Sequence, residues 1–297
     1  MSNVLVELSD ALAAAAEKGG ASTLLVDARR RMPASGIATA ADLVLTADHV
    51  VEREDGIRVT LPDGTGLSAT LAGRDPGSDL AVLRLERAAA KPAGPAESAR
   101  VGQLVLALGR PSTDGLEASL GVVSALGGPA RTHRGMIDRY IRTDTTPFPG
   151  FSGGPLVDAE GRVVGLNTSG FGHGAALTVP ASLAWKIAEQ LAKHGSVVRG
   201  YLGVRSQAVE IADATQVTLK RQQASGLLVV SVERGSPAES GGMLVGDIIV
   251  AVDGQPVLEH DALFARLGAD LVGKSAALEV LRGGQPQTLK VKIGARP

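Results

Sequence analysis

One serine of this chain lies in a segment that suits an exposed reactive turn. In PGFSGGPLV, residues 149–157, three glycines and two prolines surround Ser152. Such composition is common in ordinary loops, because glycine and proline favour tight turns. It is equally suited to a loop that holds a hydroxyl nucleophile where a substrate can reach it. Residues elsewhere in the chain have to decide between these alternatives.

The same segment fits the pattern G-x-S-x-G, which marks the nucleophile of α/β-hydrolases. That alternative needs a strand before the serine, a helix after it, and then an acid and a histidine. Here a proline-rich loop, TTPFPG, precedes Ser152, and Gly-Gly-Pro and a strand-like run follow it. The local context therefore disfavours the α/β-hydrolase alternative.

A histidine and an aspartate upstream of Ser152 favour another arrangement. His49 ends an apolar run in LTADHVV, and Asp79 precedes one in GSDLAVLRL. Each residue alone is ordinary, because histidines are often structural and aspartates often form turns. The order His, Asp, Ser is that of trypsin-like enzymes, in which these side chains form one catalytic group. The sequence therefore predicts nucleophilic catalysis by Ser152, His49 and Asp79.

The elements that would position these residues are expected to be mostly strands. Between about Thr23 and Pro180, many short apolar or β-rich runs alternate with turn signals, as in a sandwich or barrel. An amphipathic helix is expected at 4–18, ending at Gly19-Gly20. A second helix is expected in PASLAWKIAEQLAKHG, with Ser182 capping its start and Gly195 its end.

After Gly200 the pattern changes to a compact α+β unit. Ser236 is expected to cap a short helix that begins at Pro237, with Glu239 completing a capping box. Asp253-Gly254 predicts a two-residue hairpin turn, and SAALEVLRGGQPQTLKVKI a closing hairpin.

Several segments together resemble the HtrA/Deg family of serine proteases. SGIATAADLVLTADHVV, SDLAVLRL, TDTTPFPGFSGGPLV and GRVVGLNT are similar to its trypsin-like domain, and YLGV and SPAESGGMLVGDIIVAVDGQPV to its C-terminal PDZ domain. The resemblance implies a mostly β protein, in which a trypsin-like double β-barrel precedes an α+β PDZ domain. The expected parts are an N-terminal helical segment at 1–22, a protease domain at 23–197 and a PDZ domain at 198–297.

The resemblance implies an ATP-independent serine endopeptidase that cleaves unfolded or misfolded proteins. Ser152 would attack the carbonyl carbon, His49 would move the proton, and Asp79 would orient the imidazole. The amides of Gly150 and Ser152 would form the oxyanion hole. The family usually has asparagine before the nucleophile, and here Phe151 stands there. An inactive, chaperone-like or peptide-binding protein that works through its PDZ domain is the alternative.

The resemblance also identifies candidate substrate-binding residues. Basic-specific relatives carry an acid six residues before the nucleophile, where this chain has Thr146. An apolar, small-to-medium preferred residue is therefore expected, in a pocket near Leu166, Asn167, Thr168 and Ser169, with Phe148 and Phe171 at its rim. In the PDZ domain, Tyr201, Leu202, Gly203 and Val204 would bind a peptide C-terminus. Leu263 is expected in the opposite wall of that groove, whereas for Leu267 the groove and the core are equally expected.

Composition narrows the classes of partner and cofactor. A net charge of −1 argues against nucleic-acid binding, and no apolar run approaches the ~18 residues of a membrane span. Without cysteine, thiol chemistry and cysteine-based metal sites are excluded. The segment GADLVGKS fits a phosphate-loop pattern, but its expected neighbours, a helix before and a strand after, are in the wrong order. We expect no cofactor and no metal.

The location and partners follow from the N-terminus and the resemblance. The first residues lack a positive start, and Glu7, Asp10 and Glu17 interrupt their apolar stretch, unlike a secretory signal. The chain as given is therefore expected to be cytoplasmic, although family members are commonly periplasmic or envelope-associated. Unfolded polypeptides and peptide C-termini are the expected partners. The resemblance implies a homo-oligomer, a trimer, although the N-terminal aromatic residues often used in its contacts are absent before Tyr140.

Overall fold

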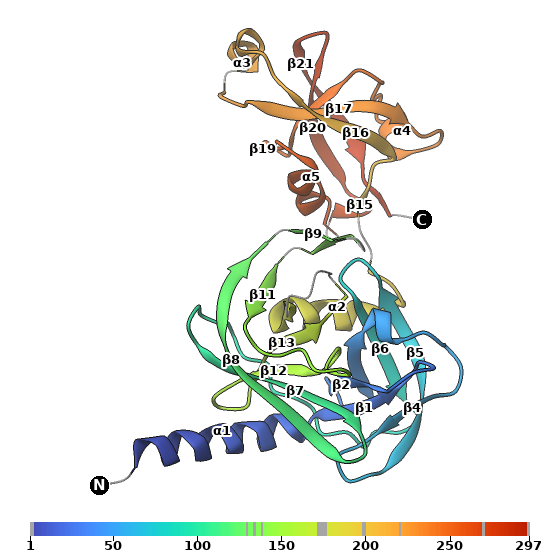
Figure 1. The fold of residues 1–297 in the computed structure, drawn as a ribbon. Coiled ribbons are helices and arrows are strands. Elements are labelled where there is room, and N and C mark those ends of the chain that lie inside the picture. Colours follow the sequence, from blue (N-terminus) through green and yellow to red (C-terminus); the bar gives the residue numbers. More distant parts are fainter. Residues whose placement is uncertain are drawn as a thin grey trace. The chain divides into compact units, whose positions relative to one another are not determined.

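The computed structural model describes residues 3–128, 130–132, 135–137, 139–170, 177–197, 200–219, 221–268 and 271–295. The chain divides into two compact units, residues 1–197 and 198–297. Strands make up most of the regular structure in both units (Figure 1).

Six strands of the first unit close into a barrel with antiparallel pairing throughout. Their order is β1-β2-β3-β6-β5-β4. They are β1 (Thr23–Asp27), β2 (Ala34–Ala38), β3 (Leu43–Ala47), β4 (Ile57–Thr60), β5 (Gly66–Asp75) and β6 (Leu80–Leu85). Ile37, Leu45 and Leu83 are among the fully buried side chains of this barrel. Closure leaves no unpaired edge strand, so the backbone polar groups of the barrel are satisfied within it.

A second barrel follows in the same unit, in the order β11-β14-β13-β12-β7-β8. Its strands are β7 (Leu104–Ser112), β8 (Gly115–Gly127), β11 (Tyr140–Thr143), β12 (Pro155–Asp158), β13 (Val163–Thr168) and β14 (Leu177–Pro180). The short strands β9 (Ala130–Thr132) and β10 (Gly135–Ile137) pair with each other. The expected mostly β architecture with two barrels is confirmed.

Helix α1 (Val4–Gly20) begins at Asn3, whose side chain accepts a hydrogen bond from the Leu5 amide. The helix continues two residues beyond the predicted end at residue 18. Gly19 and Gly20 lie inside it and are buried, because the helix end packs closely on the second barrel. A Cβ at Gly19 would lie 2.8 Å from a methyl carbon of Leu108. The two glycines therefore permit a close contact and do not end the helix.

Helix α2 (Ala181–His194) follows β14 directly and contacts strands of both barrels. The prediction that Ser182 caps this helix is wrong. Pro180 holds the N-cap position without a side-chain hydrogen bond, and Ser182 lies exposed in the first turn. The predicted end is confirmed, since Gly195 adopts φ 77° and its amide donates to the Leu191 carbonyl.

The second unit is a sheet with short helices at its margins. Its strands run in the order β16-β17-β18-β20-β21, with β19 paired to β18 and β15 paired to β22. The strands are β15 (Gly200–Tyr201), β16 (Val204–Glu210), β17 (Ser225–Val232), β18 (Ile248–Val252), β19 (Gln255–Pro256), β20 (Ser275–Arg282), β21 (Gln285–Lys292) and β22 (Gly294–Ala295). The helices are α3 (Asp213–Leu219), α4 (Pro237–Ser240) and α5 (His260–Arg266). Strand β16 lies at the end of this order, so one of its edges is unpaired in the sheet.

Local signals fix much of the second unit. Ser236 Oγ accepts from the Glu239 amide, as the predicted cap requires. The Glu239 carboxylate accepts from the Gly235 amide, one residue before the position that a standard capping box uses. The Asp253-Gly254 turn joins β18 to β19, with φ of 47° and 74° at its two residues, as expected of a two-residue hairpin.

An ion pair with a buried carboxylate joins the residue before β18 to the end of β20 in the second unit. Asp247 is 1% exposed, and Arg282 donates to both of its carboxylate oxygens, at 2.8 and 2.7 Å. The Leu244 amide donates to the same carboxylate at 2.8 Å. Burial by itself raises the pKa of Asp247, but the hydrogen bonds from Arg282 and Leu244 and the charge of Arg282 outweigh it. The net effect lowers the pKa of Asp247.

This pair gives a testable stability prediction. Asp247→Asn removes the charge while keeping the shape, so the free energy of unfolding of the second unit should fall by about 1–3 kcal/mol at pH 7. Hydrogen exchange followed by mass spectrometry should show faster exchange in β18 and β20. The control Glu259→Gln neutralises an exposed carboxyl group outside any ion pair of the described residues. It should leave exchange unchanged.

The pH dependence of the same contribution has a definite sign. Because the pKa of Asp247 is lowered in the folded state, its stabilisation is fully present above the unfolded pKa of about 4. It is lost as the pH falls through the lower folded pKa. Wild-type exchange in β18 and β20 should therefore accelerate below about pH 4, and Asp247→Asn should lack that component. Equal acid sensitivity of both proteins would contradict the assignment.

Candidate active site

His49 and Asp79 meet at the end of the first barrel that faces the second. His49 lies in the short 3-10 turn Asp48–Val50 after β3, and Asp79 lies between β5 and β6. The His49 Nδ1 and Asp79 Oδ2 atoms are 2.8 Å apart, and the His49 amide donates to Asp79 Oδ1 at 2.9 Å. With Nδ1–H donated to the carboxylate, Nε2 is left as a proton acceptor.

The Asp79 carboxylate is fully buried, so its charge has to be satisfied within the fold. Thr168 Oγ1, at the end of β13 in the second barrel, donates to Asp79 Oδ2, and the Gly170 amide donates to Thr168 Oγ1 at 2.9 Å. The Asp79 backbone adopts φ 54°, which is uncommon for a residue other than glycine. Side chains from both barrels therefore hold a buried charge in a strained turn.

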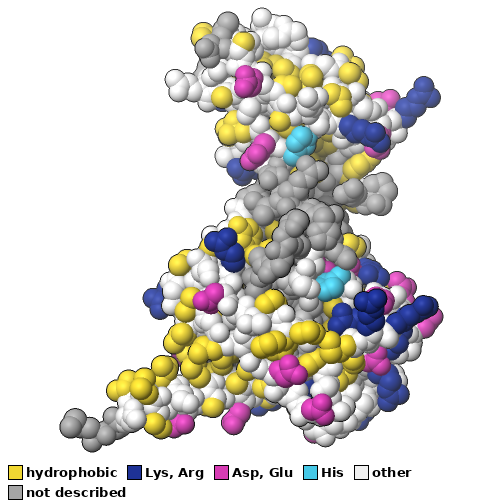
Figure 2. Space-filling view, in the orientation of Figure 1, with side chains coloured by type: hydrophobic (Ala, Val, Ile, Leu, Met, Phe, Trp, Pro, Cys, Tyr) yellow, Lys and Arg dark blue, Asp and Glu magenta, His cyan; other side chains and the backbone are white. Residues whose placement is uncertain are grey.

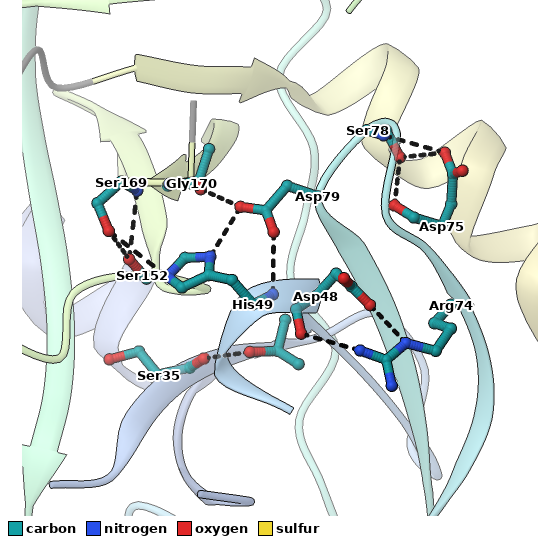
Figure 3. A network of polar contacts seen from close by, with 12 residues as sticks. Ser35, Asp48, His49, Arg74, Asp75, Ser78, Asp79, Ser152, Ser169 and Gly170 are labelled. Atoms are coloured by element: carbon teal, nitrogen blue, oxygen red, sulfur yellow. Dashed lines mark hydrogen bonds and ion pairs between the residues drawn. The ribbon is translucent and has the colours of Figure 1, made fainter. Parts of the chain in front are cut away.

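Two polar contacts stabilise the turns that carry His49 and Asp79 (Figure 3). Arg74 Nε donates to the Asp48 carboxylate at 2.7 Å, next to His49. Ser78 Oγ donates to Asp75 Oδ2 at 2.5 Å, in the turn that precedes Asp79. Asp48 is 2% exposed and Asp75 4% exposed. One contact thus holds the turn that carries His49, and the other holds the turn that precedes Asp79.

Ser152 lies beside His49, and a second serine, Ser169, contacts both side chains (Figure 3). Ser152 Oγ is 3.0 Å from Ser169 Oγ, and Ser169 Oγ is 3.4 Å from His49 Nε2. The Ser169 amide donates to Ser152 Oγ at 3.3 Å. Hydroxyl and imidazole thus lie in one continuous hydrogen-bonded group, which can transfer a proton from Ser152 to Nε2 once the serine side chain turns toward His49.

Strand β2 of the first barrel holds the loop that carries Ser152. Ser35 Oγ donates to the Gly150 carbonyl at 2.7 Å, and the Ser35 amide donates to the Ser152 carbonyl at 3.1 Å. Gly150 adopts φ 85°, a conformation that favours glycine. Among the described residues, the amides of Gly150 and Ser152 have no hydrogen-bond partner. Two free donors next to a nucleophile can stabilise an oxyanion.

Phe151 fills part of the second barrel's core. Its side chain is 2% exposed and lies in a cluster with Ala107, Leu156 and Val164. Its ring meets that of Phe148 edge to face, with centroids 5.4 Å apart. A Cβ at Gly109 would lie 2.7 Å from Phe151 Cε1, so the ring fits only against a glycine. Apolar packing therefore occupies the position where the family usually has asparagine.

A cleft of about 270 Å³ opens beside Ser152 and His49. Of the predicted substrate-binding residues, Phe148, Asn167, Thr168 and Ser169 line it. Leu166 does not line the cleft, because its side chain points into the core and is fully buried. Thr146 is exposed outside the lining, and the preceding residue, Thr145, takes its expected place. Phe171 lies outside the described residues.

The predicted PDZ residues lie at the start of β16. Tyr201 ends β15, Leu202 is buried, Gly203 adopts φ 77°, and Val204 begins β16. The amides of this segment lead into the unpaired edge of β16, where a peptide could add as a further strand. Tyr201 Oη donates to the Glu233 carboxylate.

Helix α5 carries the two leucines considered for the groove wall. Leu263 is 3% exposed and Leu267 6% exposed, and both pack in the core of the second unit. Phe264 is 54% exposed instead, with its ring centroid 6.5 Å from that of His260. His260 Nε2 lies 3.0 Å from the Ser206 carbonyl of β16. His260 and Phe264 are four residues apart, which places them on the same face of a helix. That spacing was the signal in the sequence from which this face of α5 could have been predicted.

Other residues of the site carried no recognisable signal in the sequence. Ser35 is remote from Ser152 along the chain, and only the fold brings them together. Arg29 and Met32, in the loop between β1 and β2, line the same cleft as His49. These residues reach the site only because of the way the two barrels pack together, which the sequence does not show.

Within the described ranges, no group of three or more histidine, aspartate or glutamate side chains is placed to hold a metal ion. No helix in that part of the chain is both long and apolar enough to cross a membrane.

Comparison with known proteins gives two family matches. Residues 34–166 match the trypsin-like peptidase domain and residues 200–293 match the PDZ domain. A probable periplasmic serine endoprotease, DegP-like, from Pseudomonas fulva is 38% identical over 261 residues, covering 86% of this chain and 54% of that protein. The protein of the same description from Rhizobium meliloti is 36% identical, covering 91% and 54%. The chain thus spans about half the length of these curated relatives.

Similar solved structures cover almost the whole chain. The HtrA-type protease AlgW with a tripeptide has a TM-score of 0.82 and 31% identity, covering 96% of this chain and 97% of that one. The same protease with a decapeptide has a TM-score of 0.82 and 28% identity, covering 96% and 99%.

These relatives correct the expected location. The curated proteins are named periplasmic endoproteases, so the expectation of a cytoplasmic protein is wrong. That expectation rested on the charges of the first residues. The structure shows these residues as helix α1, whose end packs on the second barrel. Their composition reflects the fold and carries no information on location.

The fit between Gly109 and Phe151 gives a prediction about Ser152. Gly109→Ala should displace the Phe151 ring and shift the amides of Gly150 and Ser152. Loss of one such donor costs about 10²-fold in rate, so labelling of Ser152 by a fluorophosphonate should slow by roughly that factor. The control Gly94→Ala places its methyl group in open space and should label normally. Normal labelling of Gly109→Ala would show that Phe151 does not hold this loop.

Proposed function

The chain belongs to the HtrA/Deg family of serine proteases, and on that premise we propose that it is a serine endopeptidase that cleaves unfolded or misfolded polypeptides without ATP. The observation that carries the proposal is the hydrogen-bonded group of Asp79, His49 and Ser152 beside two free amides. We propose a protease domain at 23–197 and a PDZ domain at 198–297, with residues 1–22 as an N-terminal helical segment.

In the proposed mechanism, a substrate carbonyl group enters the cleft with its carbon next to Ser152 Oγ. Its oxygen then lies next to the backbone amides of Gly150 and Ser152. Ser152 Oγ turns from Ser169 toward His49 Nε2 and attacks the carbonyl carbon as the imidazole takes its proton. The Asp79 carboxylate, 2.8 Å from Nδ1, stabilises the imidazolium. His49 then gives the proton to the leaving amine, and a water molecule, activated by His49 in the same way, releases the acyl group from Ser152.

The oxyanion hole consists of the Gly150 and Ser152 amides. Ser35 and the buried Phe151 ring hold these groups in place before any substrate binds. A donor that needs no reorganisation stabilises the developing charge most effectively, because no solvent has to be rearranged during the reaction. The packing of Phe151 therefore supports an active loop and argues against the catalytically silent alternative.

The cleft supports a preference for an apolar residue before the cleaved bond. Ala107, Phe148 and Leu177 contribute apolar surface, and Thr145 and Asn167 carry no charge. A lysine or arginine side chain would find no acidic partner there. A small or medium apolar side chain, typical of the interior of folded proteins, fits this lining and suits a substrate in which such residues have become exposed.

The second unit is proposed to bind peptide C-termini along the free edge of β16. Tyr201, Leu202, Gly203 and Val204 would supply the amides for the carboxylate, and Phe264 an apolar contact. We also propose a periplasmic location and a role in protein quality control. Assembly of several copies, a trimer by resemblance, is proposed as well. Exposed Val4, Leu5 and Val6 on α1 provide apolar surface for it.

The proposed protease activity has a direct test. Wild-type protein should degrade an unfolded protein such as casein without ATP, whereas Ser152→Ala should lose at least about 10³-fold in rate because the nucleophile is absent. The matched control Ser98→Ala removes an exposed hydroxyl outside the cleft and should degrade casein normally. Equal rates for wild type and Ser152→Ala would contradict Ser152 as the nucleophile.

The proposed peptide site has a separate test. A peptide with a free C-terminal carboxylate should increase the rate of casein cleavage, and the same peptide with an amidated C-terminus should do so only at much higher concentration. Phe264→Ala should weaken binding of the free-carboxylate peptide about tenfold, measured by fluorescence anisotropy. An unchanged cleavage rate at saturating peptide would show that peptide binding does not activate the protease.

A further inference from the structure

A loop of the first barrel brings a positive charge into the catalytic cleft. Residues 28–33, between β1 and β2, read ARRRMP, and Arg29 and Met32 line the same cleft as Ser152 and His49. Met32 is 45% exposed. On the face of the first unit shown in Figure 2, Lys and Arg side chains are interspersed with Asp and Glu, mostly toward one margin. Nothing in the proposed chemistry uses this charge.

The Arg29 guanidinium is fixed in place without a counter-ion. Its Nε donates to the Met32 carbonyl at 2.5 Å and its Nη2 to the Pro33 carbonyl at 3.2 Å, and Nη1 has no hydrogen-bond partner among the residues that the structure describes. In the described parts of the chain, Arg29, Arg30 and Arg31 form no ion pair. A partly buried guanidinium that is already oriented, yet unpaired, is suited to bind a carboxylate.

The acidic residues nearest to this loop have other partners. Asp27 pairs with Arg53 at 2.8 Å, and Asp48 and Glu54 both pair with Arg74. The Glu52 carboxylate accepts from the Arg30 amide at 3.4 Å. The Glu52 carboxylate thus lies at the loop itself, but no ion pair between Arg29 and any of these acids is found among the described residues.

The 28–33 loop lies beside the segment that carries Ser152. Asn167, Thr168 and Ser169, where the acyl part of the substrate is proposed to pair, line one side of the nucleophile. The loop approaches the segment before Ser152, since the Pro33 carbonyl would lie 3.1 Å from a Cβ at Gly150. A polypeptide that pairs near Ser169 and passes over Ser152 would meet Arg29 in the same cleft if its leaving part turns toward Gly150.

We propose that Arg29, supported by the charges of Arg30 and Arg31, binds a substrate carboxylate shortly after the cleaved bond. This proposal rests on the proposed protease function and adds a substrate class to it. The carboxylate can come from an aspartate or glutamate side chain or from a chain terminus close to the cut. Cleavage is favoured where an apolar residue precedes the bond and an acidic group follows it within a few residues.

Matched peptides test this subsite. They share one apolar acyl part and carry glutamate or glutamine at the first, second or third position after the cleaved bond. For wild type, we expect kcat/KM to be about tenfold higher for glutamate than for glutamine at one of these positions, as one charge-assisted hydrogen bond provides. The ratio should approach one in Arg29→Gln and at high salt, and should be intermediate in Arg29→Lys.

A control variant tests whether any lost positive charge has the same effect, and two further peptides identify the source of the carboxylate. Arg100→Gln removes an exposed positive charge outside the cleft and should keep the wild-type ratio. Peptides that end two residues after the cleaved bond, with a free or an amidated terminus, distinguish a terminal carboxylate from a side chain. Equal kcat/KM for all matched pairs would overturn the subsite while leaving the protease intact. Failure of wild type to cleave any peptide or casein would overturn the protease function and the subsite with it.

Discussion

The buried carboxylate of Asp79 is the constraint on which the rest of the site depends. A charge with no exposure to water is tolerated only when hydrogen-bond donors surround it. Here the donors come from both barrels, His49 from the first and Thr168 from the second. Satisfying this one charge therefore fixes the imidazole and also fixes how the barrels meet.

The loop that carries Ser152 is also held by both barrels, by hydrogen bonds from the first and by apolar packing in the second. Ser35 of the first barrel binds the carbonyls of Gly150 and Ser152, while the Phe151 ring packs in the core of the second. Hydrogen bonds set the direction of the peptide groups, and apolar packing prevents the loop from moving away. Phe151, at the position where the resemblance leads one to expect asparagine, thus holds the loop by apolar packing.

The sequence predicted the architecture, and it predicted that His49, Asp79 and Ser152 would lie together, because these depend on local patterns and on motif order. Short apolar runs indicated the barrels, and the order of His49, Asp79 and Ser152 indicated the chemistry. What it missed depends on contacts between distant segments. Leu263 and Phe264 are adjacent apolar residues, and only the orientation of α5 places the first in the core and the second at the surface. Gly19 and Gly20 resembled a helix end, but a close contact with the second barrel keeps them helical.

A site divided between two barrels is sensitive to how those barrels meet. Separating Thr168 from Asp79, or Ser35 from the Ser152 loop, would take the site apart while each barrel kept its own strand pairing. The geometry of the site therefore depends on the integrity of the whole first unit, and not only on the folding of either barrel.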